Sequence, residues 1–227
     1  MTHVPDHGVY GEAPAELLGL GAACVGDGGG VAMHSSIGPA WTGAAVAGPA
    51  FTVRCAAGDN LALHVAVARA PAGSVLVADA SADREFGYWG EVLTSAAAAR
   101  GVAGLVIDGG ARDIDAVERL RFPLFPERVC HRGATKVGPG AVGGEVVVGG
   151  AVVRTGDLVV GDRDGVTVVA VGELGAVLER ARAKGGAEPG IIERLRAGAT
   201  TIGLLGLDAD AIDVAPRSED RSPPDRW

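Results

Sequence analysis

The 227-residue chain lacks an excess of basic side chains. Its 20 Lys and Arg residues are outnumbered by 28 Asp and Glu residues, which gives a formal net charge of −8. Because no cluster of Lys and Arg is available to displace counterions from phosphates, we expect no nucleic-acid partner. A small anionic substrate remains compatible with this composition, since its binding depends on local charge.

The features of secreted and membrane proteins are also missing. The first residues, MTHVPDHGVYGEA, contain neither a basic start nor an apolar core, and no segment reaches about 18 continuous apolar residues. The three cysteines, Cys24, Cys55 and Cys130, are widely spaced and match no metal-binding pattern, so we interpret them as reduced thiols. These absences predict a cytoplasmic protein that does not contact a membrane.

Length and glycine content set the expected organisation. We predict one domain over residues 1–215 and a disordered tail over 216–227, where the sequence is charged and rich in proline. The 37 glycines follow no repeat period and therefore indicate many tight turns. The glycine loop at Gly28–Gly30 lacks the Lys-Ser/Thr step of a phosphate-binding loop and the preceding strand of a dinucleotide site, which argues against nucleotide binding.

The first half of the chain alternates between helical and strand patterns. Helical spacing is found at 13–24, 61–69, 91–100 and 114–120, and strand-like segments at 44–55 (interrupted by Gly48-Pro49), 74–79 and 101–108. This alternation predicts an α/β fold. Beyond an extended segment at 122–126, β-branched stretches at 142–153 and 158–171 predict short strands and hairpins. A final helix is expected over 172–196, broken near 184–190 by glycine and proline.

The run GVAGLVIDGGARD, residues 101–113, predicts a buried strand that ends in glycines and presents Arg112 and Asp113 at its carboxyl end. Small ligands of open α/β proteins bind outside such strand ends. A carboxylate offers an oxygen ligand to a hard cation, and a guanidinium offers a forked donor to an oxyacid. The pair therefore indicates a candidate site.

Four glycine-punctuated motifs occur in order along the chain. They are AGPAFTVRCAAGDNLALH (47–64), WGEVLTSAAAARGVAGLVIDGGARD (89–113), FPLFPERVCHRGATKVGPG (122–140) and TGDLVVGDRDGVTVV (155–169). Over roughly residues 22–207 the chain resembles the class II 4-hydroxy-4-methyl-2-oxoglutarate/4-carboxy-4-hydroxy-2-oxoadipate aldolases and the related regulators of ribonuclease E activity. The resemblance implies a layered α/β/β swivelling domain of the phosphohistidine-domain type. It also implies a homotrimer or a hexamer made of two trimers, with active sites between subunits.

The resemblance further implies roles for single residues. Asp113 would ligate Mg²⁺, Mn²⁺ or another divalent cation, with water completing the shell, and Glu91 would orient those waters. The main-chain N–H groups of Gly90, Glu91, Val92 and Leu93 would bind the substrate carboxylate. Arg112 would bind the keto oxygen and stabilise the enolate that develops there.

A neighbouring subunit is expected to contribute to the same site. Glu188, or failing that Glu193, of its C-terminal helix would complete the water network around the metal, although a solvated helix residue is the simpler interpretation of either. The proton acceptor is left open: a metal-bound hydroxide is favoured, and His64 and His34 are interpreted as structural histidines.

The implied reaction is metal-dependent cleavage of a 4-hydroxy-2-oxo acid to pyruvate and a carbonyl product, with oxaloacetate decarboxylation as a related activity. The alternative is a non-catalytic regulator that binds a protein such as a ribonuclease. A third possibility, a methyltransferase, is disfavoured because no glycine-rich methyl-donor site follows the first strand. Two departures from the family pattern, at Glu127-Arg128 and at Gly28–Gly30, leave the natural substrate open.

Overall fold

The structure is a computed structural model that describes residues 10–213. By its internal contacts the chain divides into two compact units, residues 1–185 and 186–227. The prediction of a single domain over 1–215 stays a prediction. The predicted disordered tail, 216–227, lies outside the described residues.

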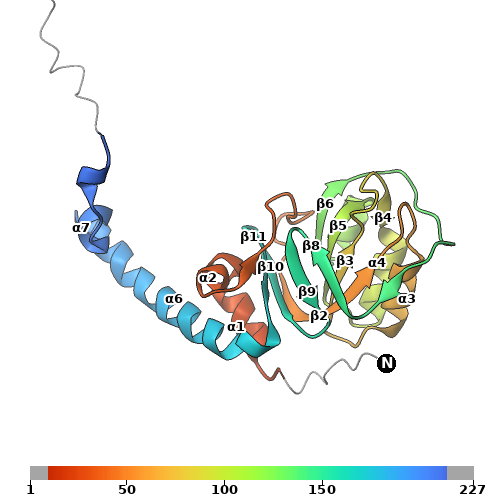
Figure 1. The fold of residues 1–227 in the computed structure, drawn as a ribbon, viewed down its shortest axis with the longest axis horizontal. Helices are drawn as coiled ribbons and strands as arrows, with labels where there is room; N and C mark the ends of the chain where they lie inside the picture. Colours follow the sequence, from red (N-terminus) through yellow and green to blue (C-terminus); the bar gives the residue numbers. More distant parts are fainter. Residues whose placement is uncertain (1–9, 214–227) are drawn as a thin grey trace, which may run out of the picture. The chain divides into compact units, whose positions relative to one another are not determined.

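Strands and helices alternate through most of the chain (Figure 1). The strands are β1 (Val31–Ala32), β2 (Val46–Arg54), β3 (Val75–Asp79), β4 (Gly87–Trp89), β5 (Gly104–Ala111), β6 (Leu124–Val129), β7 (Ala141–Val142), β8 (Glu145–Val148), β9 (Ala151–Arg154), β10 (Leu158–Asp162) and β11 (Gly165–Val169). The helices are α1 (Ala13–Leu20), α2 (Ala22–Asp27), α3 (Leu61–Arg69), α4 (Glu91–Ala99), α5 (Ile114–Arg119), α6 (Leu174–Arg196) and α7 (Thr201–Leu205), with 3-10 turns at Val171–Glu173 and Ala209–Ala211.

The main sheet of the first unit combines parallel and antiparallel pairing. Its order is β1-β11-β10-β2-β3-β5-β4, with β6 also paired to β5 and β7 to β2. The strands β2, β3, β5 and β6 run parallel, whereas β10 is antiparallel to both β2 and β11. Strand β3 pairs with residues 104–108 of β5, and β4 pairs beyond it with Gly110 and Ala111. The end of β5 therefore lies beside β4 and the turn that leads into α4.

The parallel strands form the middle of three layers, between helices on one side and the hairpin β8–β9 on the other (Figure 1). Helix α3 packs on β2 and is followed around the molecule by α4 and α5, while the hairpin β8–β9 lies against β2 and β3. This arrangement confirms the predicted α/β fold with α/β/β layering. The β-branched hairpin is only half covered, since Val147 and Val152 pair across it and both stay exposed.

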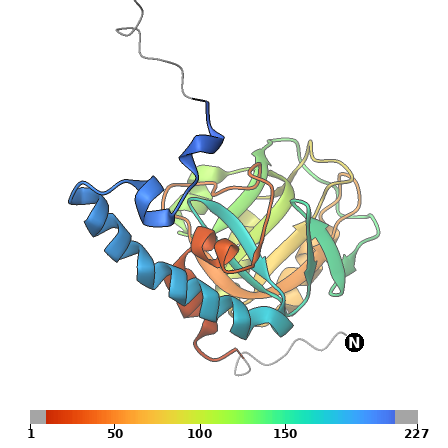
Figure 2. The ribbon, with the colours of Figure 1, turned by 60° about the vertical axis from the view of Figure 1, so that its left-hand side comes forward.

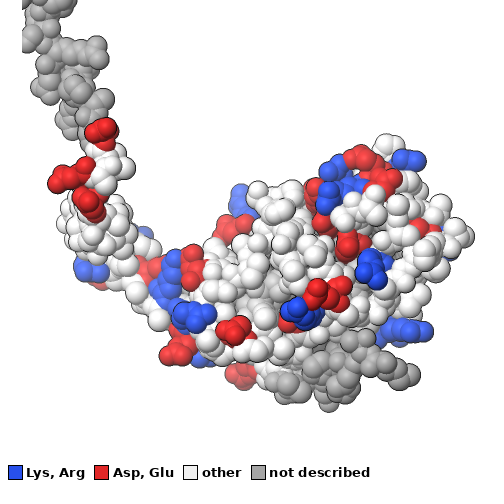
Figure 3. Space-filling model, in the orientation of Figure 1, with Lys and Arg blue, Asp and Glu red and all other residues white. Residues whose placement is uncertain are grey.

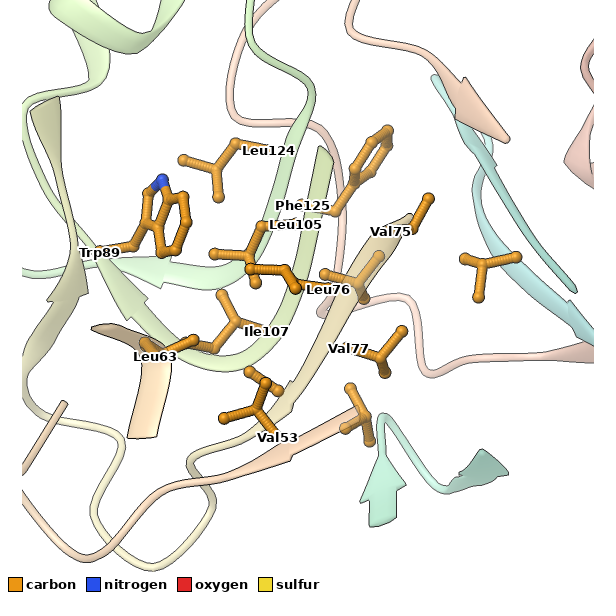
Figure 4. Packing of buried hydrophobic residues seen from close by; sticks show 14 of the residues in the cluster. Val53, Leu63, Val75, Leu76, Val77, Trp89, Leu105, Ile107, Leu124 and Phe125 are labelled. Atoms are coloured by element: carbon orange, nitrogen blue, oxygen red, sulfur yellow. The ribbon is translucent and has the colours of Figure 1, made fainter. Parts of the chain in front are cut away.

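The core explains why the first half of β5 is a run of large apolar residues. All eight of its residues are buried, as expected for a parallel strand that is covered on both faces. Figure 4 shows Leu105 and Ile107 of β5 packed beside Leu76 of β3 and Leu63 of α3. Burial of this kind fixes the position of the residues that follow Ala111.

A second, smaller core lies at the other end of the sheet. The helices α1 and α2 and the first turns of α6 pack on β10 and β11, as Figure 2 shows. Leu17, Val25, Val160 and Val177 are among its buried residues. The loop at Gly28–Gly30 belongs to this region: Arg180 Nε donates to Gly28 O at 2.5 Å, and a Cβ at Gly30 would lie 2.5 Å from Thr167 Cγ2. The glycine loop is thus part of the packing of α6.

Strand β2 corrects the expected interruption at Gly48-Pro49, because it runs unbroken from Val46 to Arg54. Its pairing with β10 covers residues 46–49, and its pairing with β3 covers residues 50–54. Pro49 therefore lies where no pairing with β3 is needed, so its missing N–H costs little. Gly48 approaches Gly73 O so closely that a Cβ would lie 2.5 Å away.

Two helical predictions also need correction. The segment 13–24 forms two helices rather than one, since Gly21 adopts φ 82° between α1 and α2. Conversely, α6 continues through Pro189, where a break was expected. Its first half is held by the buried residues Val177, Leu178 and Ala181.

The second unit contains the end of α6 and the short helix α7. Thr200 Oγ1 accepts the N–H of Gly203 at the start of α7, and Gly206 ends it with φ 62°. No residue from 186 to 213 is buried, although Ile192, Ile202, Leu205 and Leu207 are large and apolar. Within residues 10–213, no helix has both the length and the apolar character needed to cross a membrane.

Candidate functional site

Arg112 and Asp113 lie where β5 leaves the sheet. The last residues of the strand are small because the neighbours leave no room: a Cβ at Gly110 would lie 2.4 Å from Phe86 O. Asp113 then adopts φ 58° and ψ 37° at the start of α5. This left-handed conformation is uncommon for a residue other than glycine and turns the carboxylate out of the helix that follows.

The N-terminus of α4 meets this carboxylate. The N–H of Glu91 donates to Asp113 Oδ2 at 3.1 Å, and the N–H of Arg112 donates to Trp89 O at 2.8 Å. A Cβ at Gly90 would lie 2.5 Å from Asp113 Oδ2, so only glycine permits this approach. The main-chain N–H groups of Val92 and Leu93 have no acceptor within the helix, whereas that of Glu91 is taken by Asp113.

The two charged side chains remain accessible. Arg112 Nε lies 3.7 Å from Asp113 Oδ2, and each side chain is 44% exposed. Within the described residues Asp113 Oδ1 has no hydrogen-bond partner. The pair is therefore loosely coupled and can engage a ligand. On the face drawn in Figure 3, acidic and basic side chains of the first unit are interspersed, without one continuous basic patch.

Two recesses flank the pair. The narrower one, of about 120 Å³, is lined by Asn60, His64, Gly87, Tyr88, Trp89, Gly90, Val92, Leu93, Arg112, Asp113 and Lys136. The wider one, of about 590 Å³, is lined by Glu91, Arg112, Asp113, Ile114, Asp115, Ala116, Arg119, Val129 and His131. Every site residue predicted from the first unit thus borders one recess or both.

The two histidines considered from the sequence separate in space. His64 lines the narrow recess, and its Nε2 is buried with no hydrogen-bond partner. Burial lowers the pKa of His64, Lys136 lowers it further, and Asp59 partly opposes both. His34 is exposed and lies outside both recesses, with its ring against Gly150.

Sequence reasoning missed Asn60, Tyr88 and Lys136 as lining residues. Asn60 donates from Nδ2 to Tyr88 O at 2.8 Å, while its Oδ1 is buried without a partner. A weak signal was present in the sequence, because Asn60 precedes His64 by four residues and such residues lie on one face of a helix. Lys136 carries no local signal, since it belongs to a loop some 70 residues away.

Asp59 fixes that loop. It is 3% exposed, and its Oδ2 accepts from Thr135 Oγ1 (2.7 Å), Val137 N (2.6 Å) and Gly138 N (2.9 Å). Its Oδ1 accepts from Leu61 N at 2.9 Å, at the start of α3. Burial alone would raise the pKa of Asp59, but these four donors together hold it well below its usual range. One carboxylate therefore joins α3 to the loop that carries Lys136.

The acidic residue at Glu127 has a partner that the sequence did not reveal. Arg84, in the loop between β3 and β4, lies 2.6 Å from Asp108 Oδ1 and 2.8 Å from Glu127 Oε2. Arg128 pairs with Glu85 of the same loop. Through these ion pairs, Glu127 and Arg128 connect β6 to the segment that leads into β4.

The predicted contributions of Glu188 and Glu193 belong to the second unit. Both residues are exposed on α6. The three cysteines are free thiols, as predicted, and only Cys55 is fully buried. Within residues 10–213, no three His, Cys, Asp or Glu side chains gather into a cluster that could hold a metal ion by themselves.

Comparison with known proteins gives consistent relatives. A family profile described as RraA-like (Aldolase/RraA) matches residues 22–168. A Halalkalibacterium halodurans protein named "Putative 4-hydroxy-4-methyl-2-oxoglutarate aldolase" is 40% identical over 152 residues, which cover 67% of this chain and 72% of that protein.

Solved structures with a similar fold include members of the same family. An uncharacterised protein from Pseudomonas syringae pv. tomato superposes with a TM-score of 0.75 at 33% identity, covering 83% of this chain and 90% of the other. Streptomyces coelicolor RraAS2, described as an unusual member of the RNase ES inhibitor RraA protein family, gives 0.70 at 27% identity, covering 85% and 98%.

Proposed function

The chain belongs to the RraA-like (Aldolase/RraA) family, and from this we propose that it is a divalent-metal-dependent lyase. Its substrate is a 4-hydroxy-2-oxo acid, most suitably a diacid, and its products are pyruvate and a second carbonyl compound. The observation that carries the proposal is the meeting of Arg112, Asp113 and the N-terminus of α4 at one point, where Glu91 N donates to Asp113 Oδ2 at 3.1 Å.

The side chains suit a hydrated Mg²⁺ or Mn²⁺ rather than an ion enclosed by protein ligands. Mg²⁺ is commonly held by one or two carboxylates and keeps several waters. Asp113 offers the free oxygen Oδ1 for direct ligation, because Oδ2 is occupied by the N–H of Glu91. The Glu91 carboxylate, at the same helix start, would hold the waters.

The proposed chemistry uses the groups around this point. A divalent cation bound at Asp113 would supply a Lewis acid for the keto oxygen. Arg112 donates to the same oxygen as negative charge develops there, and the N–H groups of Val92 and Leu93 bind the carboxylate. Cleavage of the C3–C4 bond leaves pyruvate enolate. The same groups would stabilise the enolate that oxaloacetate forms on losing CO₂.

Assembly is part of the proposal. We expect a homotrimer or a hexamer in which Glu188 of a neighbouring subunit reaches the water network. The exposed apolar side chains of residues 186–213 support association, because a short helix such as α7 is marginal in water without a packing partner.

A second candidate is a regulator that covers a protein partner. The structural similarity to Streptomyces coelicolor RraAS2, which is described as a member of a family of RNase ES inhibitors, favours this candidate. A surface that only binds protein has no need of an accessible Arg-Asp pair beside a helix N-terminus, so we rank the lyase first.

Pyruvate release tests the two candidates. The purified protein is assayed with several 4-hydroxy-2-oxo acids and with oxaloacetate, with and without Mg²⁺ or Mn²⁺. We expect metal-dependent release that Asp113→Ala abolishes without loss of the folded state, because an exposed turn carboxylate contributes little to packing. Release that is equal in the variant at saturating metal would remove Asp113 as a ligand, and no release from any compound would favour the regulator.

A further inference from the structure

Two residues that line the narrow recess each carry a buried polar atom that the protein leaves without a partner. Asn60 Oδ1 and His64 Nε2 are both buried, and neither has a hydrogen-bond partner among the described residues. Asn60 itself is 6% exposed. A buried polar atom without a partner costs about 1–3 kcal/mol, so two such atoms at one recess point to a ligand that satisfies them.

The orientation of Asn60 is set by its neighbour. Its amide faces Tyr88 O at 2.8 Å, and a carbonyl can only accept, so the atom facing it must be the NH₂ group. The amide oxygen is therefore the unused atom. Main-chain bonding links the two residues as well, since His64 N donates to Asn60 O at 3.3 Å at the start of α3.

The recess also carries two cationic side chains. Arg112 and Lys136 are donors without acceptor capacity, and both line the same space. A ligand that satisfies all four side chains needs oxyanion or keto oxygens for Arg112 and Lys136 and an O–H group for the acceptors of Asn60 and His64. This combination describes a hydroxylated oxo acid, in which one molecule carries both kinds of group.

We propose that His64 is the catalytic base of the lyase and takes the proton of the substrate's C4 hydroxyl at Nε2. This inference rests on the proposed function. The O–H bond breaks and its proton forms a bond with Nε2. The electron pair of the O–H bond becomes the second bond of the new C4 carbonyl, and the C3–C4 electron pair passes into the enolate of pyruvate. The imidazolium then releases its proton to solvent, and C3 of the enolate takes one from solvent.

Electrostatics agree with that role. Burial and Lys136 hold the pKa of His64 below its usual value against the opposing effect of Asp59, and Arg112 and Asp113 are the other charged groups at the recess. The lowered pKa favours the uncharged ring at neutral pH, and the tautomer that carries its proton on Nδ1 would present a lone pair at Nε2. The sequence favoured a metal-bound hydroxide as base, but the unpartnered Nε2 makes His64 the stronger candidate.

Two substrates of the same enzyme separate this role from general support of the pocket. Cleavage of a 4-hydroxy-2-oxo acid requires loss of a hydroxyl proton, whereas decarboxylation of oxaloacetate does not. We expect His64→Gln to lower kcat for the cleavage about 10²-fold or more, as for loss of a general base. Its decarboxylation rate and its affinity for pyruvate, measured by calorimetry in the presence of Mg²⁺, stay within about threefold of the wild-type values.

Chemical rescue of an inactive variant is the second test of the proposed base. His64→Ala leaves a space of the size of the lost ring, and added imidazole is expected to restore part of the cleavage activity without changing the decarboxylation. His34→Gln is the matched control, since this exposed histidine lies outside both recesses, and it should behave as the wild type.

The outcomes are distinguishable from failure of the proposed function. If the wild type cleaves no hydroxylated substrate, both the lyase proposal and this inference fall. If the wild type cleaves such a substrate and His64→Gln does so at an equal rate, the base is another group. A parallel loss of cleavage, decarboxylation and pyruvate binding in His64→Gln would show a merely structural histidine and would also overturn the inference.

Discussion

Arg112 combines a charge with a geometry that no other basic residue reproduces. Its side chain is accessible, and its main chain is fixed by the bond to Trp89 O. Arg112→Lys keeps the charge but replaces a planar fork by a single ammonium group. We expect kcat/KM for pyruvate release to fall about 10²-fold or more, because a preorganised donor to the developing enolate is lost.

Steady-state kinetics at saturating metal check this prediction. Arg163→Lys, on an exposed turn remote from both recesses, serves as the matched control. A change of less than about threefold in Arg112→Lys would show that the guanidinium fork is not used in the reaction.

Asp59 makes a prediction about stability and pH. Both carboxylate oxygens of Asp59 accept hydrogen bonds from N–H or O–H groups. In Asp59→Asn one of these oxygens is replaced by an NH₂ group, which cannot accept, so at least one of the bonds is lost in either orientation of the amide. We expect Asp59→Asn to lower the free energy of unfolding at pH 7 by at least about 1–3 kcal/mol.

The sign of its pH dependence follows from the lowered pKa of Asp59 in the folded state. The stabilisation by the carboxylate is complete above its unfolded pKa of about 4 and is lost as the pH falls toward the folded value. Denaturant titrations should therefore show the wild type and Asp59→Asn converging below about pH 4. An equal difference at pH 7 and pH 3 would contradict the assignment, and Asp164→Asn, at an exposed turn, should show no such convergence.

At the scale of elements, the approach of α4 to the end of β5 depends on the absence of one side chain. Gly90 is extended, with φ −166°, so alanine is compatible with its backbone. The added Cβ, however, would lie 2.5 Å from Asp113 Oδ2 and 3.1 Å from Arg112 Cγ. We expect Gly90→Ala to remain folded, with a Tm near that of the wild type, and to lose most of its metal-dependent pyruvate release.

Paired measurements of Tm and kcat/KM test this expectation. Gly175→Ala is the control, since a Cβ there meets no atom within 4 Å. Full activity of Gly90→Ala would show that the contact between α4 and Asp113 is not needed for turnover.

Local patterns in the sequence predicted the elements that carry the site. The apolar run before Asp108 identified β5, and the glycines after it predicted the position of Arg112 and Asp113 at the strand end. The buried strand was predicted correctly, because a parallel strand covered on both faces imposes its pattern on consecutive residues. Its bounds were wrong: β5 begins at Gly104 rather than Gly101, and it continues through Gly109 and Gly110 to Ala111, since these small residues fit between β4 and β6. The same local reasoning failed at Gly48-Pro49, where the change of pairing partner from β10 to β3 makes proline tolerable.

The narrow recess depended on contacts that local patterns do not encode. Asn60 N donates to Thr135 O, and Asp59 accepts from the same loop, so Lys136 is brought beside His64 by residues far apart in the chain. Likewise, Arg84 is the partner of Glu127 across separate loops. Only the folded arrangement reveals which polar atoms are satisfied and which are left for a ligand.

At the scale of the whole molecule, a shared site makes a prediction about mixtures of subunits. Asp113→Ala and Glu188→Gln should each be poorly active alone. Co-assembled, they are expected to recover part of the activity, because some sites then combine an intact Asp113 with an intact Glu188 from the neighbour. Light scattering should give the mass of a trimer or hexamer.

The mixing experiment requires subunit exchange, which is achieved by refolding the two variants together and compared with each variant refolded alone. A monomer in solution, or no recovery from mixed oligomers, would contradict the shared site.

The order of strands has a consequence for the timing of folding during synthesis. β2 pairs with β10, and β1 pairs with β11, so segments near the start of the described chain find partners that are made more than 100 residues later. Until β10 emerges from the ribosome, one edge of β2 has no strand beside it at residues 46–49. Such distant pairing slows folding and leaves an edge open to other chains. The nascent polypeptide therefore passes through a vulnerable interval that the mature protein no longer displays.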